Sequence, residues 1–261
     1  MQEIPPTLRL TRMITRRNLL SGAMVSIALR PESSQCQGSL EGCGITVDQT
    51  EALLGSERVW LSYSSVETGS GDRDFDQALA QTLQFLSDRF FVLPGFAFFD
   101  EPGSANAFAS PSRKLGRSDG DVLFGRKLFR KIISRRERPE IGIVSVCAHE
   151  FGHIAQYKYD VYNRLVGLDR RKKRLELHAD FLSGYFAGIR KLERADYPAA
   201  TFAITQFGFG DYSDDVEHHG TPDERGAAVV AGYRAGYDEK LKFGYALESG
   251  IRYVKQIRNV N

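Results

Sequence analysis

The sequence predicts an α+β fold in which a small mixed sheet comes first and a mainly helical half follows. Short apolar segments bounded by proline lie before residue 126, whereas most of the long helical patterns lie after it. Strands that precede helices in this way, rather than alternating with them, are typical of the α+β class. The composition, with 42% hydrophobic and 26% charged residues, is that of a globular protein with a sizeable core.

The β-rich part contains one helix and several short strands. Residues 74–91 are predicted to be helical because apolar side chains recur every three or four positions, at Leu79, Leu83, Leu86 and Phe90. Residues 95–99 are apolar and aromatic between two prolines, which indicates a strand. Residues 106–109 and 122–124 are further short extended segments, and residues 59–63 form an earlier one.

The helical half contains three long predicted helices. The first covers residues 139–159 and begins at a proline, which suits the first turn of a helix. The second covers residues 169–192. The third starts at Thr221, which can cap the helix together with Glu224 in a capping box, while Pro222 takes the first helical position.

The first 35 residues differ from the rest of the chain and predict an export signal. A basic start precedes an apolar run over residues 19–29, which is too short for an ordinary membrane-spanning helix. Arg16 and Arg17 lie in a segment that resembles the twin-arginine export motif of bacteria. We therefore expect a periplasmic or extracellular protein whose residues 36–261 form a single domain. An uncleaved anchor and an amphipathic N-terminal helix are the alternatives.

Three cysteines are too few for a disulfide framework or for a cysteine-based zinc site. Cys36 and Cys43 are close enough in sequence to form a bridge in an oxidising compartment, and two free thiols are the alternative. Cys147 lies two residues before His149, so it points to a different side of the same helix. We expect Cys147 to be a small core residue.

The pattern His149-Glu150-Phe151-Gly152-His153 has the spacing of a zinc-binding helix. Residues four apart on a helix differ by about 40° around its axis, so both imidazoles project from one face and can bind one Zn²⁺. Glu150 lies one step round from the metal, where it can act as catalytic base toward a zinc-bound water. Two surface histidines are the alternative, but the helix is apolar almost all round and should be buried.

A catalytic zinc keeps three protein ligands and one open position. On the next predicted helix, Glu176 and Asp180 are four residues apart and share a face. Glu176 is the preferred third ligand, and His178, which points elsewhere, is the rival. Asp180 is expected to contact the imidazole of His149 or His153 from behind and fix its tautomer.

These residues resemble the zinc sites of known peptidases. His149-Glu150-x-x-His153 followed by Glu176 is similar to the thermolysin-type arrangement, in which a glutamate on the following helix completes the zinc site. The segment Glu176-Leu177-x-Ala179-Asp180, together with Gln156 and Gly184, is more similar to a family of bacterial neutral zinc metallopeptidases. The resemblance implies a zincin-like fold, with an edge strand over the zinc helix.

The chain also resembles the CAAX prenyl protease and its bacterial heat-shock relatives. The matching stretch before the zinc helix, which in those families lines the substrate cleft as an edge strand, consists of Asn106, Ala107, Phe108 and Ala109. Residues 219–225 resemble their late segment, which implies a catalytic residue that donates to the oxyanion, with His219 as the first candidate and Arg225 as the second. A surface histidine and a salt-bridged arginine are the alternatives. The chain lacks the several membrane helices of that family, so a lipidated substrate is not expected.

The function implied is that of an exported zinc-dependent endopeptidase with one Zn²⁺ per chain. A catalytically silent zincin-like binding or assembly protein of the cell envelope is the alternative. The expected partner is a protein or peptide substrate. Basic runs occur at residues 126–138 and 170–174, but the net charge is only +2 and no nucleic-acid motif accompanies them, so no nucleic acid is expected. No stable membrane span is expected in the mature chain.

Overall fold

The computed structural model describes residues 66–101, 103–166, 172–212 and 218–257. Within these ranges the chain is a mixed α and β structure with a small four-stranded sheet and eight helices, so the expected α+β class is confirmed. The predicted export signal, Cys36, Cys43 and the early strand at residues 59–63 lie outside the described residues. Among the helices within them, none has the length and apolar character needed to cross a bilayer.

The sheet is mixed and runs in the order β1-β2-β4-β3. Its strands are β1 (Val66–Glu67), β2 (Gly95–Phe99), β3 (Ala107–Ser110) and β4 (Asp121–Gly125). β2 and β4 are parallel, whereas β1 and β3 pair antiparallel with β2 and β4 respectively. Every residue of β2, β3 and β4 is buried, which explains why these strands appear in the sequence as continuous apolar runs.

The helices are α3 (Arg73–Phe90), α4 (Arg126–Ile133), α5 (Pro139–Lys158), α6 (Val161–Leu165), α7 (Lys173–Glu193), α8 (Ala200–Phe207), α9 (Pro222–Tyr237) and α10 (Phe243–Gln256). The predicted helices at residues 74–91 and 139–159 agree with α3 and α5 to within a residue. The helix predicted at residues 169–192 overlaps α7. The predicted capping box is present at the start of α9: Thr221 Oγ1 accepts from the Glu224 N–H, and the Glu224 carboxylate accepts from the Thr221 N–H.

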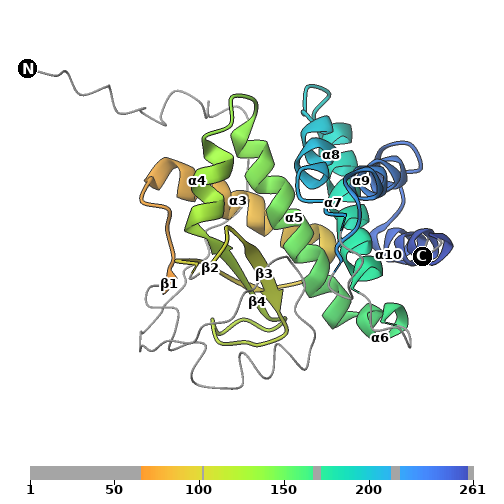
Figure 1. Cartoon of the computed structure of the whole chain (residues 1–261), viewed down its shortest axis with the longest axis horizontal. Helices are drawn as coiled ribbons and strands as arrows, with labels where there is room; N and C mark the ends of the chain where they lie inside the picture. The colour runs from red at the N-terminus through yellow and green to blue at the C-terminus, as the bar shows by residue number, and fades with distance from the viewer. Residues whose placement is uncertain (1–65, 102, 167–171, 213–217, 258–261) are drawn as a thin grey trace, which may run out of the picture.

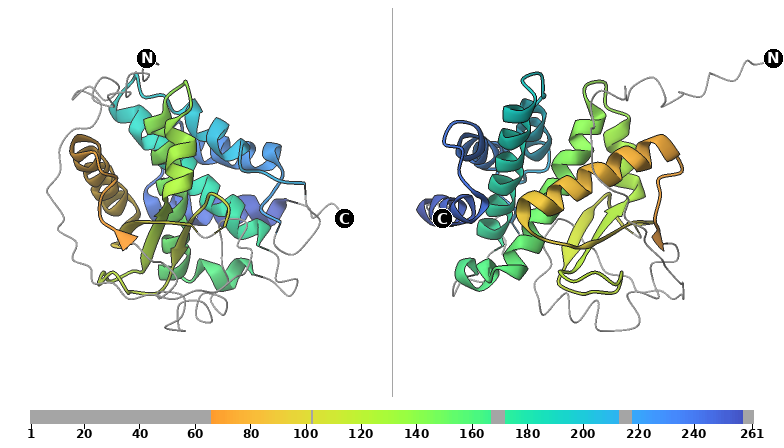
Figure 2. Two further views of the ribbon diagram at one scale, coloured as in Figure 1. Left: turned by 60° about the vertical axis from the view of Figure 1, so that its left-hand side comes forward. Right: turned by 180° about the vertical axis from the view of Figure 1, so that it is seen from behind.

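Helix α5 lies between the sheet and the later helices (Figure 1). It packs against β3 and β4 on one side and against α7 and α8 on the other. Seen from behind, α3 crosses the same region and packs on α5 (Figure 2). Helices α7 to α10 gather on the far side of α5 from the sheet and form the helical half of the described chain.

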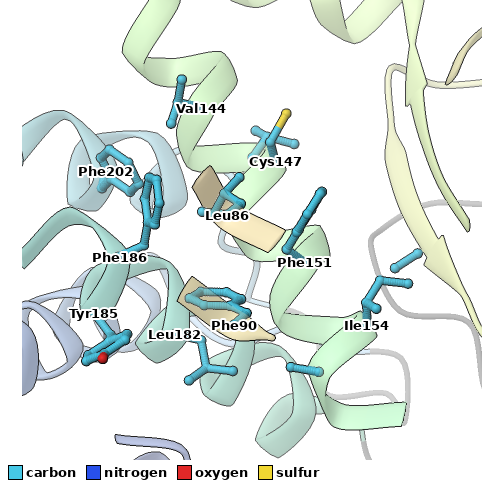
Figure 3. Packing of buried hydrophobic residues seen from close by; sticks show 14 of the residues in the cluster. Leu86, Phe90, Val144, Cys147, Phe151, Ile154, Leu182, Tyr185, Phe186 and Phe202 are labelled. Atoms are coloured by element: carbon cyan, nitrogen blue, oxygen red, sulfur yellow. The ribbon is translucent and has the colours of Figure 1, made fainter. Parts of the chain in front are cut away.

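One face of α5 forms the centre of the core. Figure 3 shows Val144, Cys147, Phe151 and Ile154 of α5 grouped with aromatic and aliphatic side chains of α3 and α7. Their spacing of three and four residues places them on one side of the helix. Cys147 is fully buried there, as expected, and burial raises the pKa of its thiol. The opposite face of α5 is left for His149 and His153.

Glycines bring α7 close to α5 and to α9. A Cβ at Gly152 of α5 would lie 3.1 Å from the Cα of Ala179, so α5 and α7 approach closely at this glycine. Toward α9 the packing is tighter still. A Cβ at Gly184 of α7 would lie 1.9 Å from the Val229 carbonyl oxygen, and one at Gly232 of α9 would lie 1.7 Å from the Phe181 oxygen. The two backbones therefore touch, and the first turn of α9 is held beside Asp180 of α7.

Candidate metal centre

Two histidines of α5 and one glutamate of α7 converge in the interior. The Nε2 atoms of His149 and His153 are 3.1 Å apart, and they lie 3.3 Å and 3.4 Å from the two carboxylate oxygens of Glu176. One ligand atom from each residue lies within 4.8 Å of the others. All three side chains are buried. The structure thus brings together the three residues that the sequence selected as metal ligands.

Asp180 fixes the orientation of His149. Its Oδ1 atom lies 2.8 Å from His149 Nδ1. Burial raises the pKa of Asp180, but the charge of Arg225 and the hydrogen bonds from Arg225 and His149 outweigh burial and hold that pKa below its ordinary value. An ionised carboxylate only accepts hydrogen bonds, so His149 must donate from Nδ1. Its Nε2 then presents a lone pair to the cluster, as expected for a residue that supports a ligand from behind.

Gln156 fixes the orientation of His153 in a similar way. Its Oε1 atom lies 3.0 Å from His153 Nδ1, while its Nε2 donates to the Leu175 carbonyl oxygen at 2.7 Å. Because a carbonyl oxygen can only accept, the amide nitrogen must face Leu175 and the amide oxygen must face His153. His153 therefore carries its proton on Nδ1, and its Nε2 also presents a lone pair to the cluster.

Three acceptors consequently meet with no donor between them. Within the described part of the chain, neither carboxylate oxygen of Glu176 has a hydrogen-bond partner, although both are buried. Two lone pairs and a carboxylate at about 3 Å repel one another unless a proton or a cation lies among them. Burial lowers the pKa of His153 to about 4, which disfavours the proton. The donor set of two imidazoles and one carboxylate suits Zn²⁺.

His178 does not join this cluster. It is fully buried, and its Nδ1 lies 3.2 Å from Gln156 Nε2 while its Nε2 lies 3.2 Å from the Leu247 carbonyl oxygen. Both ring nitrogens are thus engaged away from His149 and His153. Of the two rivals for the third ligand, the structure places Glu176, and not His178, beside the two histidines.

Arg225 binds Asp180 from the first turn of α9. Its Nε and Nη2 lie 2.8 Å and 3.0 Å from the two oxygens of Asp180, and Nη2 also donates to Gln206 Oε1 at 3.1 Å. Nη2 is 3.9 Å from a Glu176 oxygen, beyond hydrogen-bond range. The guanidinium therefore lies behind the cluster and is directed at Asp180. Its expected role as a donor to an oxyanion stays a prediction.

His219 precedes α9 and is held by Asp211. The backbone N–H of His219 donates to Asp211 Oδ2 at 3.1 Å, and its Nδ1 lies 3.3 Å from the same oxygen. Its Nε2 is buried and has no hydrogen-bond partner among the residues that the structure describes. Its expected role as a donor to an oxyanion also stays a prediction.

The remaining predicted site residues lie around α5. Glu150 follows His149 on this helix and is fully buried. Ala107, Phe108 and Ala109 belong to β3, the last strand of the described sheet, which packs on α5; Asn106 precedes it and accepts from the Gly125 N–H at 3.0 Å. The catalytic role of Glu150 and the substrate-binding role of this strand stay predictions.

Sequence reasoning missed the contacts that Gln156, Gln206 and Asp211 make at the site. Gln156 is three residues after His153, a helical spacing at which side chains meet, so that contact was detectable from the sequence. Asp211 and Gln206 reach His219 and Arg225 from other segments, and no local pattern indicates such pairs.

Comparisons of the chain with protein-family models, with curated proteins and with solved structures found no match.

Proposed function

We propose that the chain is a zincin-like zinc peptidase in which His149, His153 and Glu176 hold one Zn²⁺. The observation that carries this proposal is the meeting of three buried acceptors without a donor, each imidazole already holding its proton on Nδ1. Two imidazoles and a carboxylate, with a further position open, are the ligand set of catalytic zinc in several peptidases.

The order of elements supports the same proposal. An antiparallel terminal strand, β3, lies beside α5 with its two histidines, and α7 follows with its glutamate. The resemblance to zincin-like peptidases implies such an edge strand over the zinc helix, and in the prenyl protease family the matching strand lines the substrate cleft. A substrate that is bound in this way would lie extended beside β3.

In the proposed reaction, each side chain of the site has a separate role. A bound Zn²⁺ would make water more acidic and would polarise the scissile carbonyl group. The Glu150 carboxylate accepts the proton of the attacking water and returns it to the leaving amine nitrogen. His219 donates from Nε2 to the oxyanion that develops on the carbonyl oxygen. Asp211, whose Oδ2 atom lies 3.3 Å from His219 Nδ1, holds the ring in place.

Hydrolysis of unfolded casein by the full chain, supplied with one equivalent of Zn²⁺, tests the proposed reaction. Replacing Glu150 with Gln keeps the side-chain size but removes the base, so hydrolysis should fall about 10²- to 10⁴-fold while zinc is retained. Glu137→Gln, an exposed position before α5, is the matched control and should leave the rate unchanged. A wild-type chain that binds zinc but does not cleave casein would instead favour the silent binding protein.

Metal analysis of the purified variants tests the ligands themselves. His149→Ala and His153→Ala each remove one of three ligands, so each should lose stoichiometric zinc. Full zinc occupancy in either variant would contradict the assignment.

A further inference from the structure

We propose that Gln156 and His178 form a relay that holds the proton of His153 on Nδ1 and so keeps Nε2 ready for a metal ion. The inference rests on the proposed metal centre and assigns two positioning residues to it. The relay runs from His153 on α5 through Gln156 to His178 on α7, and ends on backbone carbonyl groups.

Two carbonyl oxygens set the direction of every hydrogen bond in this relay. Leu247 O lies 3.2 Å from His178 Nε2, and Leu175 O lies 2.7 Å from Gln156 Nε2. A carbonyl oxygen has no proton to give, so both nitrogens must be the donors. The neutral ring of His178 then has a lone pair on Nδ1, which accepts the second amide proton of Gln156 at 3.2 Å.

Both amide protons of Gln156 are therefore used, and its oxygen is left to face His153 at 3.0 Å. The flipped amide would lose two hydrogen bonds and would set its oxygen against two acceptors. It would also point an N–H at His153 Nδ1, which would move the imidazole proton to Nε2. That proton would then lie between His149 Nε2 and Glu176, where the metal ion is proposed to bind.

Burial makes these hydrogen bonds hard to replace. Gln156 is 1% exposed and His178 is 0% exposed, so water cannot readily take over either partner. Gly250 of α10 leaves space for the imidazole ring of His178, because a Cβ at position 250 would lie only 2.9 Å from His178 Cδ2. The relay thus connects α10 to a ligand on α5, and His149 and His153 are oriented differently: His149 by a carboxylate and His153 by a neutral amide.

Two matched variants test the relay through the affinity for Zn²⁺, measured by competition with a chromophoric chelator. Gln156→Met keeps the length of the side chain but removes the amide, so the affinity should fall about 10- to 100-fold. At position 178, Asn and Leu have the same branched shape and the same number of heavy side-chain atoms, but only Asn offers an acceptor near the place of Nδ1. His178→Asn should therefore bind Zn²⁺ more tightly than His178→Leu. Equal affinities for wild type and Gln156→Met would overturn the relay.

A second measurement needs no metal and does not depend on whether a variant folds. Nitrogen-15 NMR of the imidazoles in the metal-free wild-type chain reports which nitrogen of His153 carries the proton. The relay requires the Nδ1–H tautomer, and a His153 found mainly as Nε2–H would overturn it. A wild-type chain that binds no Zn²⁺ would defeat the proposed metal centre, whereas the tautomer measurement would still decide the relay.

Discussion

Asp180 is the residue at which the proposed metal centre and α9 meet. Its carboxylate accepts from His149 Nδ1 at 2.8 Å and from two nitrogens of Arg225 at 2.8 Å and 3.0 Å. All three side chains are almost completely buried, so each charge depends on its partner for stabilisation. The pair with Arg225 keeps Asp180 ionised, and an ionised Asp180 keeps the proton of His149 on the nitrogen that faces away from the cluster.

Replacing Asp180 with Asn should therefore lower both the affinity for Zn²⁺ and the free energy of unfolding. The variant should still bind Zn²⁺ at saturating metal, but with affinity or hydrolysis about 10- to 100-fold lower. The buried guanidinium of Arg225 loses its counter-charge, so the free energy of unfolding should fall by about 3–5 kcal/mol. Zinc competition and urea denaturation measure the two effects.

Asp196→Asn is the matched control for that experiment. Asp196 pairs with Arg194 at 3.4 Å but is 78% exposed, so its loss should cost less than about 1 kcal/mol. Equal effects of the two substitutions on stability would contradict the buried role of Asp180.

The sequence separation of the site residues decides which of them could be predicted. His149, His153, Glu176 and Asp180 were predictable because each pair is set four residues apart on one helix, where the helical period decides the face. The partner of Asp180 was not predictable, because Arg225 reaches it from another helix 45 residues later. Gln156 was noted only as part of a family resemblance, and its role could not be predicted. That role depends on His178 and on two backbone carbonyl groups, which only the fold brings near Gln156.

At the scale of elements, the packing of α7 on α9 determines where Arg225 lies. The glycines Gly184 and Gly188 of α7 face the α9 backbone, and Gly232 and Gly236 of α9 face the α7 backbone. Hypothetical Cβ atoms at these positions would lie between 1.7 Å and 2.5 Å from carbonyl oxygens of the other helix. A side chain at any of them would therefore push the helices apart and move Arg225 away from Asp180.

Gly232→Ala tests this packing. Because the new Cβ would clash with backbone rather than with a movable side chain, the free energy of unfolding should fall by about 1–3 kcal/mol or more. Gly244→Ala in α10 is the control: it is exposed, no atom lies within 4 Å of the added Cβ, and alanine should stabilise the helix by about 0.4–1 kcal/mol. Chemical denaturation of both variants decides the matter, and a stable Gly232→Ala protein would contradict the close packing.

The loop between β3 and β4 is held by a buried carboxylate. Asp121 is 1% exposed and accepts from the backbone N–H groups of Lys114 and Leu115 at 2.7 Å and 3.1 Å. Burial outweighs these hydrogen bonds and raises the pKa of Asp121 from 3.8 to about 6. The folded protein therefore holds this proton more tightly than the unfolded chain, so stability is lost as the pH rises from about 4 to about 6.

Asp121→Asn removes this titration. Relative to wild type, the free energy of unfolding of the variant should rise by up to about 3 kcal/mol as the pH rises through that window. A loss of stability that does not depend on pH is also expected, because Asn has one acceptor oxygen where Asp has two. Urea denaturation of both proteins at pH 4, 5, 6 and 7 measures the difference. A difference that stays flat or changes in the opposite direction would show that Asp121 is ionised throughout.

Elements were predictable where their patterns are local. Helix α3 and strand β2 were expected within a residue because apolar spacing and flanking prolines mark them. Helix α10 was missed although its buried residues Phe243, Leu247, Ile251 and Val254 recur at helical spacing. Helix α8 has a weaker pattern, since Ile204 and Phe207 are exposed on it. The pairing of α7 with α9 lay beyond sequence reasoning, because spaced glycines do not identify their partner.

At the scale of the whole molecule, the export signal expected at residues 1–35 would precede the proposed zinc peptidase. The twin-arginine route carries folded proteins, which would allow the buried site to receive its metal before export. Replacing Arg16 and Arg17 with Lys should trap the precursor in the cytoplasm of a bacterial host. Cell fractionation with immunoblotting measures this, and unchanged appearance of mature protein outside the cytoplasm would rule out the route.

The proposed zinc site consists of His149, His153 and Glu176 in the interior of the folded chain. X-ray absorption at the zinc edge, on the full chain loaded with one equivalent of Zn²⁺, reports the atoms that surround the metal. We expect two imidazole nitrogens at about 2.0–2.1 Å and oxygen neighbours at about 2.0–2.2 Å, with no sulfur. A spectrum with a sulfur neighbour near about 2.3 Å, or with oxygen neighbours alone, would contradict it.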